Sequence, residues 1–245
     1  MVPTHASLLN PPLGFAHRGA RAHARENTLD AFRLARRLGA TGLESDAWLT
    51  LDAEVVLDHD GVTGSWPRRR PLSRVGRSEL PPHVPSLAEL YEACGTDLPL
   101  SLDVKDPEAA RIVVATARDA GGEALANLWL CSPSVELLAS WRGLDDDVHL
   151  MQSTRLRAIA EGPERRAARL ADLGIDGINM PHQDWNGGLT TLFHRFERVA
   201  FAWDVQHEHQ LHATLRMGVD AVYSDHVDRM AAAVTAFGAN RRRDE

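Results

Sequence analysis

A regular alternation of short apolar runs with amphipathic helical segments along all 245 residues constrains the fold of this chain most strongly. Repeated strand and helix units are typical of an α/β fold with parallel strands. The first helix is expected to begin at an N-cap formed by Asn27, with Asp30 three residues later, and to end at Gly39. The predicted strands are Leu13–Ala16, Gly42–Leu49, Glu54–Leu57, Leu98–Val104, Asn127–Cys131, Val148–Met151, Asp176–Met180, Val199–Trp203 and Ala221–Ser224. The predicted helices are Thr28–Leu38, Ser86–Ala93, Pro107–Ala120, Ser134–Trp141, Pro163–Leu173, Leu189–Phe196 and Glu208–Met217.

The connection between the second and third predicted strands is too short for a parallel crossover. Only four residues separate Leu49 from Glu54, whereas a crossover needs about a dozen or more. These two strands are therefore expected to form an antiparallel hairpin, which returns His59 to the level of Glu44 and Asp46. The other eight strands match a closed (β/α)8 TIM barrel, a fold of about 250 residues.

Residues of about 60–86 interrupt this pattern and are expected to be a loop insertion over the active-site face. The whole chain, residues 1–245, is expected to be a single barrel domain that includes this insertion. The insertion is rich in positive charge, which either attracts an anionic substrate or is simply solvated. Its five arginines are Arg68, Arg69, Arg70, Arg74 and Arg77.

Composition excludes several classes of function. The net charge of −7, from 27 basic and 34 acidic residues, argues against a nucleic-acid-binding surface. No signal-peptide pattern and no stretch of 18 apolar residues is found in the sequence, so no stable membrane insertion is expected and the cytoplasm is the expected compartment. Cys94 and Cys131 have no metal-like spacing and are expected to be reduced and buried.

Three carboxylates at predicted strand ends indicate a metal site. Glu44 and Asp46 are two residues apart, so they point to the same face of a strand. Asp103 lies near the end of a later strand, where barrels place their functional groups. Carboxylates within about 4 Å repel by several kcal/mol per pair, a cost that a divalent cation relieves. All-oxygen ligation favours one Mg²⁺ or Ca²⁺ over zinc.

The side chains expected around this cation favour phosphate chemistry. Arg18 and Lys105 are cations suited to phosphate oxygens. His17 and His59 titrate near neutral pH and are suited to general acid and base roles. The chemistry that these residues indicate is metal-assisted hydrolysis of a phosphodiester.

The order of these motifs resembles the glycerophosphodiester phosphodiesterase family. The resemblance runs from about residue 14 to residue 230 and is carried by seven short motifs in register. They are His17-Arg18-Gly19, Glu26-Asn27-Thr28, Glu44-Ser45-Asp46, His59-Asp60, Asp103-Val104-Lys105, Trp203-Asp204-Val205-Gln206 and Ser224-Asp225-His226-Val227.

The resemblance implies a TIM barrel that hydrolyses small glycerophosphodiesters to sn-glycerol 3-phosphate and an alcohol. It implies no choice between water and the glycerol hydroxyl as nucleophile. The resemblance implies that Glu44, Asp46 and Asp103 hold a metal and that His17 and His59 form an acid/base pair. It implies that Arg18 and Lys105 bind phosphate oxygens and that Glu26 orients either Arg18 or another group that supports the site. Trp203 is implied to form an apolar wall beside the glycerol carbons.

The chain departs from the family pattern at several of these positions. Asp103 stands where the family has Glu, which shortens the side chain by one methylene and bears on the choice of metal. Asp204 and Gln206 replace Thr and Asn, and Val227 replaces the final Pro. Contacts to the substrate near the seventh barrel strand are therefore open.

Other interpretations remain open at this stage. Lys105 is also compatible with a Schiff-base lysine, and His182 and Asp184 are placed where they could reach the site. The competing functions are phospholipase D-like cleavage of lysophospholipid or sphingomyelin, and binding of a phosphodiester without turnover. The sequence predicts no oligomeric state.

Overall fold

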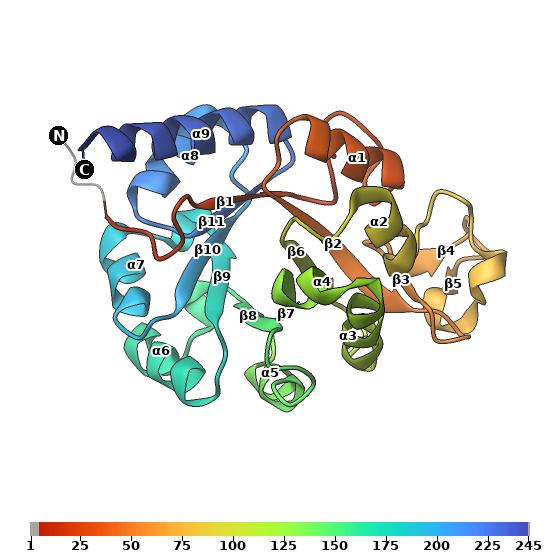
Figure 1. Cartoon of the computed structure of the whole chain (residues 1–245). Helices are drawn as coiled ribbons and strands as arrows, with labels where there is room; N and C mark the ends of the chain where they lie inside the picture. The colour runs from red at the N-terminus through yellow and green to blue at the C-terminus, as the bar shows by residue number, and fades with distance from the viewer. Residues whose placement is uncertain (1–4, 245) are drawn as a thin grey trace.

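Eight parallel strands close into a barrel in the computed structural model, which describes residues 5–244 (Figure 1). Around the barrel the order is β1, β11, β10, β9, β8, β7, β6 and β2, and β2 pairs with β1 to complete the ring. The predicted TIM barrel is confirmed. The strands are β1 (Leu13–Ala16), β2 (Gly42–Leu49), β6 (Leu100–Val104), β7 (Leu128–Ser132), β8 (His149–Ser153), β9 (Gly177–Pro181), β10 (Val199–Trp203) and β11 (Ala221–Ser224).

The ring closes at a position where the chain requires glycine. Phe15 of β1 pairs with Gly42 of β2. A β-carbon on Gly42 would lie 2.5 Å from the Phe15 ring, so a larger residue would push the two strands apart. Glycine in a strand leaves room for a close neighbour, which at this position is the Phe15 ring.

Helices follow each barrel strand and cover the outside of the ring (Figure 1). All seven predicted helices are present, with ends that differ from the prediction by two residues or fewer. Two helices were not predicted, α4 and the long α9. The helices are α1 (Leu29–Arg37), α2 (Leu87–Cys94), α3 (Ala109–Ala120), α4 (Gly122–Ala126), α5 (Val135–Trp141), α6 (Pro163–Asp172), α7 (Gly187–His194), α8 (Glu208–Arg216) and α9 (Val227–Asp244).

The predicted N-cap of α1 was wrong by one residue. The side chain of Thr28 caps the helix by accepting a hydrogen bond of 3.2 Å from the Ala31 amide. Asn27 instead adopts a left-handed conformation, with φ of 52°, and its amide oxygen accepts a hydrogen bond of 2.8 Å from the Ser45 hydroxyl. Both residue types are good N-caps. Because the Asn27 side chain is already hydrogen-bonded to Ser45, the helix is capped by Thr28 instead.

The short connection after β2 forms the antiparallel hairpin that its length predicts. Strand β3 (Val55–Leu57) pairs antiparallel with β2, and the Asp58 amide donates to the Asp46 carbonyl at 3.1 Å. The segment that follows is partly ordered into a small hairpin and two 3₁₀ turns. These are β4 (Val62–Thr63), β5 (Arg70–Pro71), η1 (Leu72–Arg74) and η2 (Arg77–Glu79).

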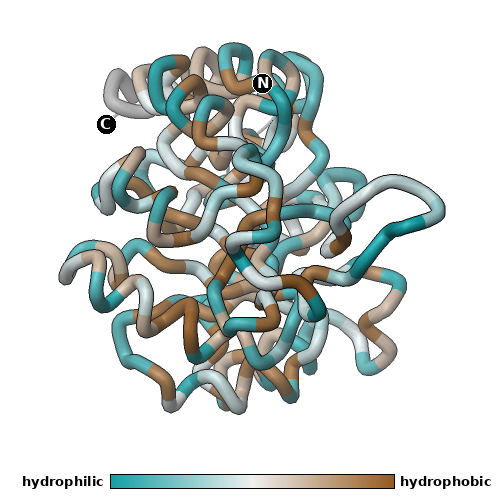
Figure 2. The backbone as a smooth tube through the Cα atoms, turned by 90° about the vertical axis from the view of Figure 1, so that its right-hand side faces the viewer, coloured by the Kyte–Doolittle hydropathy of each residue, from teal (hydrophilic) through white to brown (hydrophobic). Residues whose placement is uncertain are grey.

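Strand residues alternate between the barrel interior and the layer beneath the helices. In β7, Leu128 and Leu130 pack in the outer core, whereas Trp129 and Cys131 pack in a separate inner cluster with Phe201. The same alternation turns alternate residues of β2 and β6 inward. Figure 2 shows hydrophobic (brown) and hydrophilic (teal) segments interspersed along the backbone. Both cysteines are free and buried, as predicted.

Within residues 5–244, none of the helices combines the length and the hydropathy needed to span a membrane.

Candidate active site

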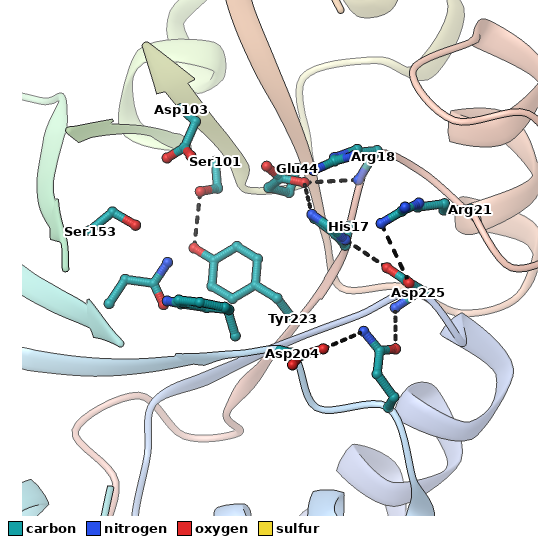
Figure 3. Close-up of a pocket in the computed structure, with 13 residues that line it drawn as sticks. His17, Arg18, Arg21, Glu44, Ser101, Asp103, Ser153, Asp204, Tyr223 and Asp225 are labelled. Carbon is teal, nitrogen blue, oxygen red and sulfur yellow. Dashed lines mark hydrogen bonds and ion pairs between the residues drawn. The ribbon is translucent and has the colours of Figure 1, made fainter. Parts of the chain in front are cut away.

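A cavity of about 300 Å³ opens at the carboxyl ends of the barrel strands (Figure 3). This is the end at which TIM-barrel enzymes carry their active sites, and the volume suits a small molecule. Ionisable groups form one wall, and Trp203 and Tyr223 contribute aromatic surface. The lining residues are His17, Arg18, Arg21, Glu44, Ser101, Asp103, Ser153, Asn179, Trp203, Asp204, Gln206, Tyr223 and Asp225.

His17 is fixed in this cavity by a carboxylate from the neighbouring strand end. Its Nδ1 lies 2.6 Å from Oδ1 of Asp225, and its Nε2 lies 3.9 Å from Oε2 of Glu44. Burial lowers the pKa of His17, but the charge of Glu44 and the hydrogen bond to Asp225 outweigh it, so the pKa is raised above 6.5. Because Nδ1 donates to Asp225 in the neutral ring, Nε2 carries the free lone pair of a general base.

The turn that presents His17 depends on an unusual backbone. Arg18 has a φ of 52° and Gly19 a φ of 77°, a region that costs little only for glycine. A β-carbon on Gly19 would also lie 2.8 Å from the backbone of Ala31. In return, the turn points the Arg18 amide at Oε2 of Glu44, where it donates a hydrogen bond of 2.8 Å.

Glu44 is an acid buried in an unfavourable setting. Burial raises its pKa to about 7; the charges of Asp46 and Asp103 add to this effect and the charge of His17 opposes it. Such a perturbed carboxyl in a cavity is a mark of functional sites. A cation beside Glu44 would remove the cost of ionising it.

Lys105 occupies the space between the other two acids. Asp46 pairs in register with Asp103 of β6, and the Lys105 ammonium lies 3.0 Å from Oδ1 of Asp46 and 2.9 Å from Oδ2 of Asp103. Although burial lowers the pKa of Lys105, these two carboxylates raise it above its ordinary value. The lysine is thus held charged, which does not suit a Schiff-base nucleophile.

The three acids fit a hard divalent cation in donor chemistry. All donors are carboxylate oxygens, as Mg²⁺ and Ca²⁺ prefer, and Oδ2 of Asp46 is buried without a hydrogen-bond partner. The oxygens of Glu44, Asp46 and Asp103 do not all lie within 4.8 Å of one another; among the described side chains, that spacing is met by a different group elsewhere. In this structure the Lys105 ammonium provides the positive charge between two of the acids.

Glu26 is paired with the guanidinium of Arg18. The Arg18 guanidinium donates to both Glu26 oxygens at 3.3 and 3.2 Å, and its Nε lies 3.5 Å from Oδ2 of Asp46. Arg21 also contacts Glu26, at 2.6 Å, and reaches Asp225 at 3.6 Å. Two guanidinium groups therefore border the cavity next to His17.

The structure does not bring the side chain of His59 into the cavity that holds His17. His59 lies in a second depression, together with Glu26 and His83, and its Nδ1 pairs with Oδ1 of Asp60 at 2.9 Å. The hairpin sets the backbone of Asp58, one residue before His59, at the level of Asp46. The His59 side chain does not lie beside the acids as predicted, because it follows the exposed loop and pairs with Asp60. Because Glu26 lines this depression and contacts Arg18, the Arg18–Glu26 pair forms a wall that the two depressions share.

Trp203 lines the cavity, and the Arg155 guanidinium carbon lies over its ring, 4.8 Å from the ring centroid. Beyond it, Gln206 is built into the hydrogen-bond network rather than turned to solvent. Its amide oxygen accepts from the Asp225 amide at 3.0 Å and from the Ser224 hydroxyl at 3.3 Å. The Gln found in place of the family's Asn thus supports the strand end that carries Asp225.

The remaining candidates lie outside the cavity. The five arginines of the insertion do not line it, and Arg70 and Arg77 pair with Glu79 and Glu89. Neither His182 nor Asp184 lines it, and Asp184 instead accepts a hydrogen bond from the Leu156 amide.

Asp225 and Arg21 line the cavity, but the sequence analysis assigned neither of them a role. Asp225 belongs to a motif that was recognised, but nothing in the motif indicates its partner, which lies 208 residues earlier. The pairing of β1 with β11, which sets Ala16 beside Ser224, brings the two ends together. Parallel neighbours end at the same edge, so only the strand order could have indicated this contact.

Comparison with known proteins agrees with these observations. Residues 17–92 match the profile of the glycerophosphoryl diester phosphodiesterase family, a range that includes His17, Glu44 and His59. A glycerophosphodiester phosphodiesterase of Caldanaerobacter subterraneus subsp. tengcongensis is 48% identical over 48 residues. That alignment covers 20% of each protein, so the chain matches about a fifth of the length of this curated relative.

Solved structures share the barrel over nearly the whole chain. The glycerophosphodiester phosphodiesterase of Thermotoga maritima superposes with a TM-score of 0.77 at 23% identity, covering 89% of this chain and 96% of that one. A phosphodiesterase of Oleispira antarctica, in complex with its product sn-glycerol-3-phosphate, superposes with a TM-score of 0.78 at 20% identity, covering 91% and 97%. The chain is thus similar to the glycerophosphoryl diester phosphodiesterase family in sequence over residues 17–92, and it shares the barrel fold of these solved structures.

Proposed function

We propose that this protein hydrolyses small glycerophosphodiesters to sn-glycerol 3-phosphate and an alcohol, with a divalent cation and histidine acid/base catalysis. The observation that carries the proposal is the juxtaposition of His17 with the acids. The ring is held by Asp225, and its free Nε2 faces Glu44 in a cavity that Asp103 also lines. The product bound to the Oleispira antarctica phosphodiesterase is the one expected here.

The residues around the cavity suit a phosphodiester. Arg18 and Arg21 present guanidinium groups, which bind phosphate oxygens in a planar, bidentate manner. Lys105 adds a third positive charge at the edge of the carboxylate cluster. Trp203 supplies an apolar wall for the glycerol carbons, and Ser153 and Asn179 offer polar groups for its hydroxyls.

His17 and His59 are proposed to divide the proton transfers. His17 accepts a proton from the nucleophile at Nε2, while Asp225 stabilises the imidazolium that forms. His59, in the depression across the Arg18–Glu26 wall, is proposed to protonate the departing alcohol. Glu44, Asp46 and Asp103 would hold one Mg²⁺ or Ca²⁺, which when bound would neutralise charge on a phosphoryl oxygen.

The test is release of glycerol 3-phosphate from glycerophosphocholine and glycerophosphoethanolamine, measured with and without EDTA. We expect release that EDTA abolishes and that Mg²⁺ or Ca²⁺ restores. Choline release from sphingomyelin vesicles alone would favour the phospholipase D-like alternative. Thermal stabilisation by the diesters with no product would favour a binding protein.

A longer acid at position 103 tests the ligand set. Asp103→Glu restores the family's residue and is expected to retain activity while changing the ratio of rates with Mg²⁺ and Ca²⁺, because the two ions differ in size and in tolerance of geometry. Activity is measured across a titration of each ion. An unchanged profile would show that Asp103 is not a direct ligand.

A further inference from the structure

A second group of potential metal ligands lies beside the cavity, on segments that leave neighbouring strands. His23 belongs to the loop after β1, and His226 and Asp228 lie at the start of α9, just after β11. Because β1 and β11 are paired in parallel, their following segments begin side by side. A hydrogen bond of 3.2 Å from the Ala22 amide to the Asp225 carbonyl ties the two segments together next to this group.

The three side chains converge as a ligand set does. One donor atom from each of His23, His226 and Asp228 lies within 4.8 Å of the other two. Nε2 of His23 is 3.1 Å from Oδ1 of Asp228, and the two imidazole rings meet edge to face with centroids 6.3 Å apart. The side chains of His23 and Asp228 are 37% and 49% exposed, so small rotamer changes can close the set around an ion at little cost.

The donors point to a particular class of cation. Imidazole nitrogen suits Zn²⁺, Ni²⁺ and Cu²⁺, whereas Mg²⁺ and Ca²⁺ require oxygen ligands. Two histidines and one carboxylate, with a remaining position for water, form a common zinc environment. The partial positive charge at the start of α9 opposes a cation, and the Asp228 carboxylate in the first turn offsets it.

We propose that His23, His226 and Asp228 form a second metal site, specific for Zn²⁺ or a similar transition metal and distinct from the carboxylate site. An ion there would clamp the loop after β1 to the start of α9. Arg21 and Asp225, which both line the cavity, flank the clamp in sequence. The site therefore fixes the wall that orients His17, and its formation is independent of the proposed hydrolysis.

Calorimetric titration with ZnCl₂ tests the site without an activity measurement. The titration is performed in the Glu44→Gln background with excess Mg²⁺, so that the carboxylate site does not contribute, and is repeated with wild-type protein if that variant does not fold. We expect one Zn²⁺ per chain and a raised melting temperature. When His23→Ala, His226→Ala or Asp228→Asn is introduced into the same protein, each should weaken Zn²⁺ binding about tenfold or more. Even residues that only support a metal ligand change metal affinity about 10–100-fold.

His209→Ala is the matched control, because this exposed histidine lies outside the group. It should leave both the zinc affinity and the zinc-induced shift in melting temperature unchanged. Equal zinc affinity in the His23→Ala, His226→Ala and His209→Ala variants would overturn the proposal. So would the absence of zinc binding in the parent protein.

Discussion

Replacing His17 with alanine is expected to lower the turnover of glycerophosphocholine about 10²- to 10⁴-fold, the range for loss of a general acid or base. The variant removes the imidazole that lies between Asp225 and Glu44 in the cavity. His59→Ala is expected to fall in the same range with almost no loss of stability, since this exposed side chain contacts only Asp60 among described hydrogen-bond partners. Initial rates at saturating metal, with His209→Ala as control, measure both effects.

The dependence of activity on pH tests the proposed role of His17. His17 must be neutral to accept a proton, and its pKa is raised by Glu44 and Asp225 against the opposing effect of burial. Activity should therefore rise with pH through a limb above 6.5. Asp225→Asn removes the carboxylate that stabilises the imidazolium, so this rise in activity should move to lower pH as the turnover falls.

A His17→Ala variant with a rate near that of wild type would remove His17 from the mechanism. The same outcome for His59→Ala would mean that catalysis uses only the residues of the cavity that holds His17.

Local patterns were sufficient to predict the barrel. Apolar runs and helix signals give the strands and helices, and the four-residue connection after Leu49 permits only a hairpin. The two-residue spacing of Glu44 and Asp46 correctly turns both acids toward the barrel interior, because side chains in strands alternate strictly. These inferences succeed because each depends on neighbours in the chain.

The errors concern contacts that only the assembled barrel creates. Asn27 and Thr28 are equivalent N-caps in sequence, and the contact of Asn27 with Ser45 of β2 decides between them. The hairpin fixes the backbone level of His59 but not its side chain, which follows the exposed loop and pairs with Asp60. The contact of His17 with Asp225 depends on which strands become neighbours when the ring closes.

Glu44→Gln is expected to lower the activity of the enzyme while raising the stability of the metal-free protein. Activity should fall about 10²-fold or more, since the variant loses a charged ligand and the cation's contribution to charge stabilisation amounts to several kcal/mol. The amide keeps the size of the side chain and can still accept the hydrogen bond from the Arg18 amide. Turnover is measured at saturating Mg²⁺ and Ca²⁺, and metal binding by calorimetry.

The metal-free stability of the same variant should change in the opposite direction. Because burial raises the pKa of Glu44 from 4.5 to about 7, folding favours the protonated acid. Below pH 4.5 the group is protonated in both states and carries no penalty. Between pH 4.5 and about 7 the unfolded state loses this proton while the folded state keeps it. The penalty therefore builds up over this range and is complete above pH 7, at a cost on the order of 3 kcal/mol. Glu44→Gln removes this cost, so in EDTA the variant should unfold at higher denaturant concentration than wild type at pH 8 and at a similar concentration at pH 4.

Added Mg²⁺ should reverse this order at pH 8, because an ion that binds only the folded state stabilises it by mass action. Wild-type protein then gains stability in proportion to its metal affinity, whereas Glu44→Gln gains little. Gln206→Glu, which adds a carboxyl to the network beside Asp225, is a matched control that should not show this metal-dependent reversal. If metal-free Glu44→Gln is no more stable than wild type at pH 8, the folded state does not disfavour the ionised form of Glu44. Equal stabilisation of both proteins by Mg²⁺ would place the cation away from Glu44.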